Sequence, residues 1–139
     1  YNIESITAGV TADPKYTRIT IVTMGDNEIL DQIEKQVAKL VDVRDVKELK
    51  PEESVYRELA LIKVRANAQE RQGVIAIADI FRAKIIDVAP ESLIIELTGN
   101  QDKVDAFLGL LSGYEILELA RTGIAGLGRG IENVTYLED

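Results

Sequence analysis

The feature that most constrains the fold of this chain is an internal repeat. Residues 19–23 alternate apolar and polar side chains like a half-buried strand, and a turn and a helical apolar period follow them. Further along, the same order returns at one constant offset, with Leu93 and Ile95 for Ile19 and Ile21, Gly99-Asn100 for Gly25-Asp26, and Val104, Phe107 and Leu111 for Leu30, Ile33 and Val37. Because the turn, the helix cap and the helix face keep this offset without a gap, we infer a duplicated unit.

The second copy of the repeat contains every element of a ferredoxin-like domain. Patterning predicts helices over about residues 69–82 and after Asn100, and strands at residues 58–66, 84–88, 93–97 and 116–120. The order βαββαβ builds a four-stranded antiparallel sheet with two helices on one face. The predicted fold class is therefore α+β, with two tandem ferredoxin-like βαββαβ domains.

The first copy is incomplete in the printed sequence. It opens on a strand, residues 3–10, that matches the second strand of the complete copy, and a last strand is predicted at residues 43–49. The first strand of this fold lies between the third and the fourth, so without it both would have unpaired backbone groups. We therefore expect the protein to carry roughly 20 to 30 more residues before Tyr1, which would supply the opening strand and helix.

A linker is predicted between the two copies. Residues 50–54 combine a proline, two glutamates and a serine and show no apolar period. The predicted organisation is an N-terminally incomplete domain at 1–49, a linker at 50–55, a second domain at 56–130 and a tail at 131–139.

The composition excludes most catalytic and nucleic-acid-binding chemistry. The chain has no cysteine and no histidine, so thiolate nucleophiles, zinc–thiolate sites and histidine proton shuttles are absent. A net charge of -8, scattered basic residues and an aromatic content of 5% argue against a nucleic-acid partner. No apolar run approaches the roughly 18 residues that span a bilayer, and no export signal is recognisable. We expect a cytoplasmic protein without a membrane partner.

Several separated stretches of the sequence resemble one known family. Residues 1–7 and 18–22 resemble the amino-acid-binding ACT domain of the acetolactate synthase small subunit. The family's C-terminal domain is similar, in the same order and spacing, to residues 57–64, 80–88, 96–99 and 120–123. The resemblance runs from Tyr1 to about Gly130 and makes both predicted domains ACT-type.

The resemblance implies a homodimeric regulatory subunit without catalytic activity of its own. Such a subunit activates a separate, thiamine-diphosphate-dependent catalytic subunit and confers feedback inhibition by valine or a related branched-chain amino acid. No cofactor or metal is expected in this chain, because thiamine diphosphate, magnesium and FAD would belong to the catalytic subunit. An ACT-type sensing module for a different metabolic enzyme is the alternative, and the C-terminal motifs argue against it. An enzyme of the acylphosphatase kind would need an arginine and an asparagine around a phosphate, which no loop here pairs convincingly.

The resemblance also implies where the effector binds. In the family the effector lies between two ACT domains, and the matching positions here are Asn2, Ile3, Glu4, Ser5 and Thr7. An amide and backbone groups at a strand entrance can bind an amino acid's ammonium and carboxylate, and Ile3 can line the side-chain pocket. The alternative is that Asn2 and Ser5 cap a turn and Ile3 is ordinary core. The glycine-containing loop that completes the site is missing from the printed sequence, so we expect this chain to bind valine weakly, which calorimetry against an N-terminally extended chain would test.

Two further segments leave their role open. The glycine-rich stretch at 123–130 is not followed by the Lys-Ser or Lys-Thr of a phosphate loop. It is either a flexible end or a contact with the catalytic subunit, with Arg121 and Arg129 as charged anchors.

A charged cluster lies where the helix predicted to end near residue 82 meets the next strand. It consists of Arg82, Lys84 and Asp87. A solvated face and a surface for the partner subunit are both compatible with this pattern.

Overall fold

The computed structural model describes residues 2–131 and divides into two compact units. One contains the chain up to Val55 together with the chain from Gly126 onward, and the other is Tyr56–Ala125. Residues 126–130, which the sequence analysis placed in the second domain, therefore group with the first unit. Except for Ile131, the predicted tail at 131–139 lies outside the described residues.

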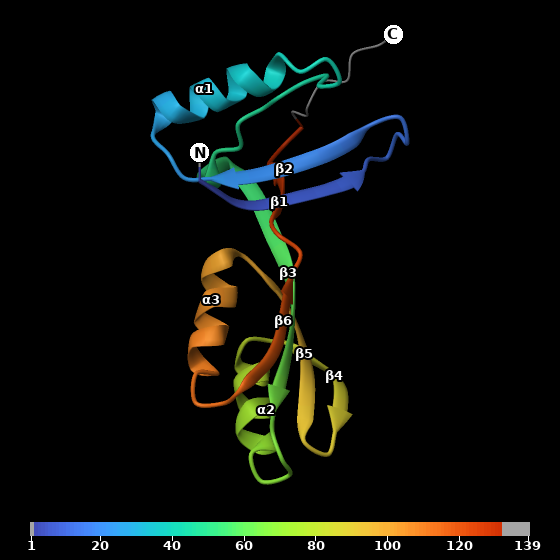
Figure 1. Cartoon of the computed structure of the whole chain (residues 1–139), viewed down its shortest axis with the longest axis vertical. Coiled ribbons are helices and arrows are strands. Elements are labelled where there is room, and N and C mark those ends of the chain that lie inside the picture. The colour runs from blue at the N-terminus through green and yellow to red at the C-terminus, as the bar shows by residue number, and fades with distance from the viewer. Residues whose placement is uncertain (1, 132–139) are drawn as a thin grey trace. The chain divides into compact units, whose positions relative to one another are not determined.

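The elements follow the order expected from the repeat except at residues 43–49 and at β7 (Figure 1). The strands are β1 (Ile3–Val10), β2 (Thr17–Thr23), β3 (Ser54–Arg65), β4 (Lys84–Ala89), β5 (Ser92–Gly99), β6 (Ile116–Arg121) and β7 (Ala125–Gly128). The helices are α1 (Asn27–Ala38), α2 (Arg71–Ile80), α3 (Gln101–Leu110) and the 3-10 turn η1 (Pro51–Glu53). The segment predicted as a linker, 50–55, thus contains η1 and the beginning of β3.

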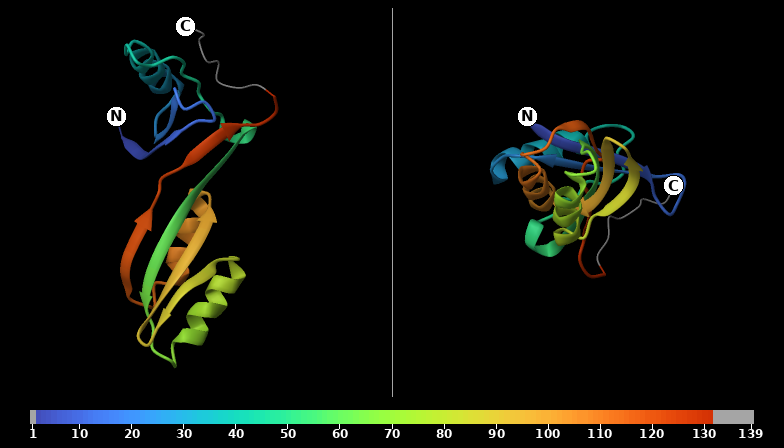
Figure 2. Two further views of the ribbon diagram at one scale, coloured as in Figure 1. Left: turned by 90° about the vertical axis from the view of Figure 1, so that its right-hand side faces the viewer. Right: turned by 90° about the horizontal axis from the view of Figure 1, so that it is seen from below.

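The second unit has the ferredoxin-like topology. Its sheet has the order β4-β5-β3-β6, and the paired strands are antiparallel, so β3, the first strand of the copy, lies between the third and the fourth. Ile62 of β3 lies opposite Ile95 of β5 and Leu119 of β6. Helices α2 and α3 lie on the same face of this sheet (Figure 2). The predicted α+β fold class is confirmed.

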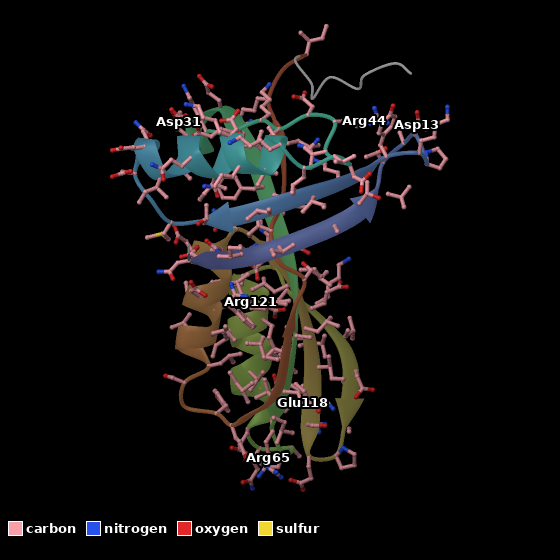
Figure 3. All side chains as sticks on the ribbon, turned by 45° about the horizontal axis from the view of Figure 1, so that its top comes forward. Asp13, Asp31, Arg44, Arg65, Glu118 and Arg121 are labelled. Carbon is pink, nitrogen blue, oxygen red and sulfur yellow. The ribbon has the colours of Figure 1, made fainter. Side chains whose placement is uncertain are left out.

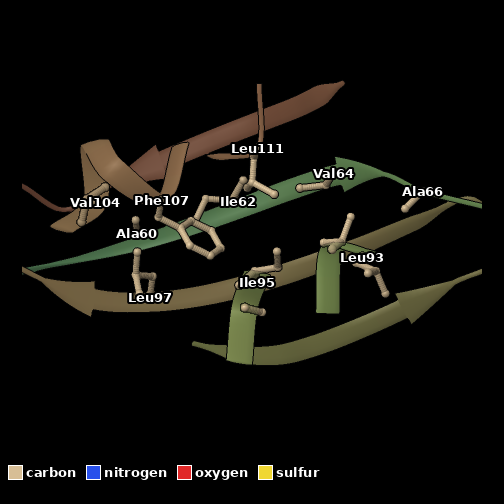
Figure 4. Close-up of a cluster of buried hydrophobic side chains, with 12 residues drawn as sticks. Ala60, Ile62, Val64, Ala66, Leu93, Ile95, Leu97, Val104, Phe107 and Leu111 are labelled. Atoms are coloured by element: carbon tan, nitrogen blue, oxygen red, sulfur yellow. The ribbon is translucent and has the colours of Figure 1, made fainter. Parts of the chain in front are cut away.

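Alternating residues of the strands and one face of each helix form the core of this unit (Figure 4). The cluster of buried side chains is Ala60, Ile62, Val64, Ala66, Val74, Ala78, Leu93, Ile95, Leu97, Val104, Phe107 and Leu111. The rings of Phe81 and Phe107 meet edge to face with their centroids 5.2 Å apart. This core holds both helices against the sheet.

The first unit has less regular structure among its described residues. β1 and β2 form an antiparallel hairpin, and α1 follows β2. The strand predicted at residues 43–49 is not formed, so that prediction was wrong. A strand requires a hydrogen-bonding neighbour, and the described strands of the hairpin pair only with each other. Apolar patterning alone therefore did not make residues 43–49 a strand.

The helix caps show that the repeat extends to local geometry. Asp26 caps α1 with φ and ψ of -78° and 177°, and Asn100 caps α3 with -78° and 175°. The side chain of Asp26 accepts a hydrogen bond from the backbone N–H of Ile29 at 3.0 Å, and that of Asn100 accepts from Lys103 at 2.9 Å. Each cap satisfies one of the donors that a helix leaves free at its first turn.

The glycine before each cap lies close to a side chain of the first helical turn. A Cβ on Gly25 would lie 2.9 Å from Cγ2 of Ile29, and a Cβ on Gly99 would lie 2.5 Å from Cδ of Lys103. In both copies the first helical turn therefore folds back on the end of the preceding segment, where a larger residue would force a neighbour to move.

Candidate functional site

The five predicted effector residues lie together at the beginning of β1. Ile3, Glu4, Ser5 and Thr7 belong to the strand, and Asn2 precedes it. The hydroxyl of Thr23 donates a hydrogen bond to the carbonyl oxygen of Asn2 at 2.7 Å, which attaches this entrance to the end of β2. Asn2, Ile3 and Glu4 are exposed, whereas Ser5 and Thr7 are half-buried.

A β-bulge interrupts the pairing at this entrance. Ile3 lies opposite Thr23 and Ser5 lies opposite Val22, so Glu4 is an extra residue on β1. A bulge takes one residue out of the regular ladder and turns its neighbours to a new direction. Together with the exposed Asn2 amide, this irregular backbone offers the donors and acceptors that the two charged ends of an amino acid require.

The alternative reading of these residues does not fit the structure. Residues 3–7 form a strand and not a turn, and the side chain of Ile3 is 54% exposed, so it is not ordinary core. The signal that sequence reasoning lacked was the bulge, because an extra residue on one strand appears only once the register with β2 is known.

The hairpin separates polar from apolar side chains. Cross-strand partners share a face, so Thr7 and Thr20 lie on one face and the pair Ile6 and Ile21 on the other. Ile6 is 55% and Ile21 41% exposed, so the apolar face is open in the described part of this unit.

A surface hollow of about 360 Å³ lies elsewhere in the first unit. Its lining residues are Asp31, Glu34, Lys35, Ala38, Val43, Arg44, Asp45 and Val46. None of the five candidate effector residues lines it, so the hollow and the strand entrance are separate features. Within residues 2–131, no three acidic side chains gather as a metal site would require.

Arg121 forms a network at one end of the second unit's core (Figure 3). Its Nε lies 2.5 Å from Oε1 of Glu58, its Nη2 lies 3.1 Å from Oε2 of Glu58, and its Nη1 lies 3.0 Å from Oδ1 of Asp105. The hydrogen bond to Glu58 raises the pKa of the Arg121 guanidinium, while partial burial opposes that rise and Asp105 adds to it. The network joins β3, β6 and α3, so the interactions seen for Arg121 are structural and do not support its predicted role as an anchor.

Sequence reasoning missed Glu58 in this network. The side chain of Glu58 is 2% exposed and shares the inward face of β3 with Ala60 and Ile62. The sequence did indicate such a pair, because Glu58 occupies an inward-facing position of a strand that alternates apolar and polar residues. A carboxylate at such a position needs a cation beside it.

The glycine-rich stretch is ordered where the structure describes it. Ala125–Gly128 forms β7, which pairs with β3, and Ile124 is 3% exposed. Nη2 of Arg18 donates a hydrogen bond to the carbonyl oxygen of Gly126 at 2.9 Å, and the backbone N–H of Arg129 donates to the carbonyl oxygen of Glu53 at 2.8 Å. The flexible-end alternative was therefore wrong for residues 125–128.

The helices of the described chain are short compared with the thickness of a bilayer. None of them is long and apolar enough to cross a bilayer.

Comparison with known proteins identifies both parts of the chain. A family model described as the small subunit of acetolactate synthase matches residues 57–130. A second model, described as the AHAS small subunit-like ACT domain, matches residues 1–45. The two matches are consecutive, as the repeat requires.

Individual relatives agree with the family models. A probable acetolactate synthase small subunit of Methanothermobacter thermautotrophicus is 47% identical over 94% of this chain and 78% of that protein. The acetolactate synthase small subunit of Haemophilus influenzae is 46% identical over 96% of this chain and 83% of its own length. The crystal structure of the acetolactate synthase small subunit from Thermotoga maritima superimposes with a TM-score of 0.86 at 45% identity, over 94% of this chain and 82% of that one. This chain therefore belongs to the acetolactate synthase small-subunit family.

Proposed function

We propose that this chain is the regulatory subunit of an acetolactate synthase and acts beside it in the cytoplasm. In this proposal it raises the activity of a separate catalytic subunit and makes that activity sensitive to valine or a related branched-chain amino acid. The observation that carries the proposal is the consecutive match of the ACT-domain model and the C-terminal small-subunit model along nearly the whole chain. A matching fold alone would leave the function open, whereas both matched models are specific to this subunit.

The proposal assigns the chemistry to the catalytic subunit. That subunit holds thiamine diphosphate, magnesium and FAD and condenses pyruvate with a second 2-oxo acid. The contribution of the present chain is binding, which fits a sequence without cysteine or histidine. An effector that binds this chain can change the activity of the catalytic subunit only if it binds two conformational states of the complex with different affinities. The effector then shifts the population toward the state that it binds more tightly.

The effector site in this proposal is the entrance of β1. Asn2 and the backbone at the Glu4 bulge bind the charged groups of the amino acid, and Ile3 contacts its aliphatic side chain. Ser5 and Thr7 follow on the strand and orient the entrance. Three features support this assignment: the exposure of Asn2 and Ile3, the irregular ladder, and the hydrogen bond from Thr23 that fixes the carbonyl of Asn2.

In the proposal the site lies between two copies of the chain. β1 is an edge of its hairpin, and within residues 2–131 only β2 pairs with it. Edge strands readily add another strand. Pairing of β1 with the same strand of a second copy would form a homodimer with the effector at the junction.

Reconstitution with the catalytic subunit tests the proposal. Acetolactate formation is measured with the catalytic subunit alone, after addition of this chain, and after addition of valine, leucine or isoleucine. We expect a higher rate with this chain and a lower rate when one of the amino acids is added. A rate unaffected by the chain would contradict the regulatory assignment.

A pair of variants tests the site separately. We expect Asn2→Ala to raise the valine concentration for half-inhibition about tenfold, because a charge-assisted hydrogen bond contributes about 1.5 to 3 kcal/mol. Lys15→Ala changes an exposed side chain in the turn of the same hairpin and serves as the matched control. Equal valine responses of the two variants would remove Asn2 from the site without affecting the regulatory assignment.

A further inference from the structure

The strand β7 is attached to the hairpin of β1 and β2 by an arginine. Nη2 of Arg18 on β2 donates a partly buried hydrogen bond to the carbonyl oxygen of Gly126 at 2.9 Å. Arg18 pairs with Gly9 on β1. Because side chains two residues apart on a strand share a face, Arg18 lies on the same face as Thr20 and its partner Thr7. The bond to β7 is therefore made from the polar face of the hairpin, which also carries the candidate effector residue Thr7.

The composition of β7 makes it a weak strand. Two of its four residues, Gly126 and Gly128, are glycines, which lose the most conformational freedom on folding and have no side chain to pack. Leu127 is exposed. Backbone groups also hold the strand, through its pairing with β3 and through the hydrogen bond from the N–H of Arg129 to the carbonyl oxygen of Glu53. A strand with so little packing can open locally while the rest of the protein stays folded.

The chain just before β7 is fixed more firmly. Ile124 is 3% exposed, and the N–H of Thr122 donates a hydrogen bond to the carbonyl oxygen of Leu59 at 3.0 Å. Gly123 lies between them with a φ of 88°, a left-handed conformation that glycine adopts without strain. β7 is therefore a strap with one end anchored at Ile124, and the bond from β2 holds the strap on the hairpin.

We propose that β7 is a releasable strap, that Arg18 is the positioning residue that holds it, and that effector binding at the entrance of β1 favours the attached strap. The coupling rests on the proposed function, because it takes the entrance of β1 as the effector site. An amino acid bound there fixes β1, and the ladder between β1 and β2 then also fixes Arg18. Holding the strap costs less conformational entropy in that state, so the effector and the strap stabilise each other.

The strap gives the effector site a path along the chain itself. The boundary between the two compact units falls within β7, between Ala125 and Gly126. Attachment of the strap to the hairpin therefore fixes a segment that continues directly into the second unit. The state of the effector site is passed on through one covalent connection.

Hydrogen exchange of the full chain measures the strap directly. The amide of Arg129 reports on β7, whereas the hydrogen-bonded amides of Thr11 and Thr122 report on the hairpin turn and on the second unit. We expect Arg18→Met to speed exchange at Arg129 about tenfold, because a hydrogen bond from a charged donor is lost. The other two amides should exchange as before. An unchanged rate at Arg129, or equal acceleration at all three amides, would overturn the strap.

Two further variants separate the hydrogen bond from the charge. Arg18→Lys keeps a charged donor, and a single bond to a carbonyl does not need the fork of a guanidinium, so exchange at Arg129 should stay near the original rate. Lys15→Met removes an exposed positive charge from the turn of the same hairpin and should also leave that rate unchanged. Exchange as fast in Lys15→Met as in Arg18→Met would assign the effect to net charge and overturn the role of Arg18.

Valine tests the coupling apart from the attachment. Saturating valine should slow exchange at Arg129 about fivefold in the original chain and should leave it unchanged in Arg18→Met, where β2 no longer holds the strap. No response at Arg129, or equal responses in the two proteins, would overturn the coupling. The reconstituted enzyme decides the proposed function separately. Inhibition with an unresponsive Arg129 amide overturns only the coupling, whereas a rate that none of the three amino acids lowers overturns the proposed feedback as well.

Discussion

Ile21 and Ile95 occupy the same position in the two copies of the repeat, yet Ile21 is 41% exposed and Ile95 is fully buried. Ile19 and Leu93 differ in the same way, at 59% and 0%. In the second unit two helices cover the strands β4, β5, β3 and β6, whereas in the described part of the first unit the helix α1 accompanies the hairpin of β1 and β2. The same pattern of apolar residues thus forms the same local elements in both copies. How deeply those apolar residues are buried depends on how many layers of helices and strands pack together.

The largest expected difference between the copies is the effect of removing a core side chain. Phe107→Ala should lower the free energy of unfolding of the second unit by about 3 to 5 kcal/mol, because it removes a fully buried ring. Ile33→Ala, at the equivalent position of the half-covered helix α1, should cost about 1 kcal/mol. Urea unfolding followed by circular dichroism measures both, and equal losses would contradict the difference in burial.

The buried ion pair is the next way to test the comparison. Arg121→Ala should destabilise the second unit by about 2 to 3 kcal/mol, since it leaves the buried carboxylate of Glu58 without its cation. Arg65→Ala breaks the bridge to Glu115, in which both side chains are more than half exposed, and should cost less than about 1 kcal/mol. If the free energy of unfolding falls by the same amount in both variants, the Arg121 network does not stabilise the end of this core.

Sequence reasoning succeeded where local rules decide the structure. Strand and helix periods, the two caps and the βαββαβ order of the second unit were all predicted, because propensity, capping and packing agree there. The strand predicted at residues 43–49 failed because a strand also needs a partner, which is a property of the sheet and not of the segment.

The site was predicted less completely than the fold. The resemblance selected residues 2–7, but the bulge at Glu4 became visible only with the register of β1 and β2. The partner of Arg121 was equally hidden, because Glu58 and Arg121 are distant in sequence and meet only across the strands β3 and β6. Contacts between strands carry the information that a single sequence lacks.

The helix caps should behave alike in the two copies. Asp26→Ala and Asn100→Ala each remove one side-chain acceptor of nearly identical geometry, so each should cost about 1 kcal/mol of local helix stability. Hydrogen exchange of the first-turn amides of α1 and α3 measures this loss. A cap effect in only one copy would show that the repeat does not extend to the energetics of its turns.

The smallest expected effect concerns the outer face of the second unit. Lys63 Nζ lies 2.8 Å from Oε2 of Glu118, and this hydrogen bond, helped by the charge of Lys63, holds the pKa of Glu118 below its ordinary value of 4.5. A folded-state pKa below the unfolded one contributes stability that is complete above pH 4.5 and is lost as the pH falls through the lower value. Lys63→Met should return the pKa of Glu118 toward 4.5, as followed by NMR titration of its carboxyl carbon.

The neighbouring bridge provides the control for this titration. Arg65→Met breaks only the bridge to Glu115 and should leave the pKa of Glu118 where it is. An unchanged pKa of Glu118 in Lys63→Met would contradict Lys63 as the cause of the lowered value.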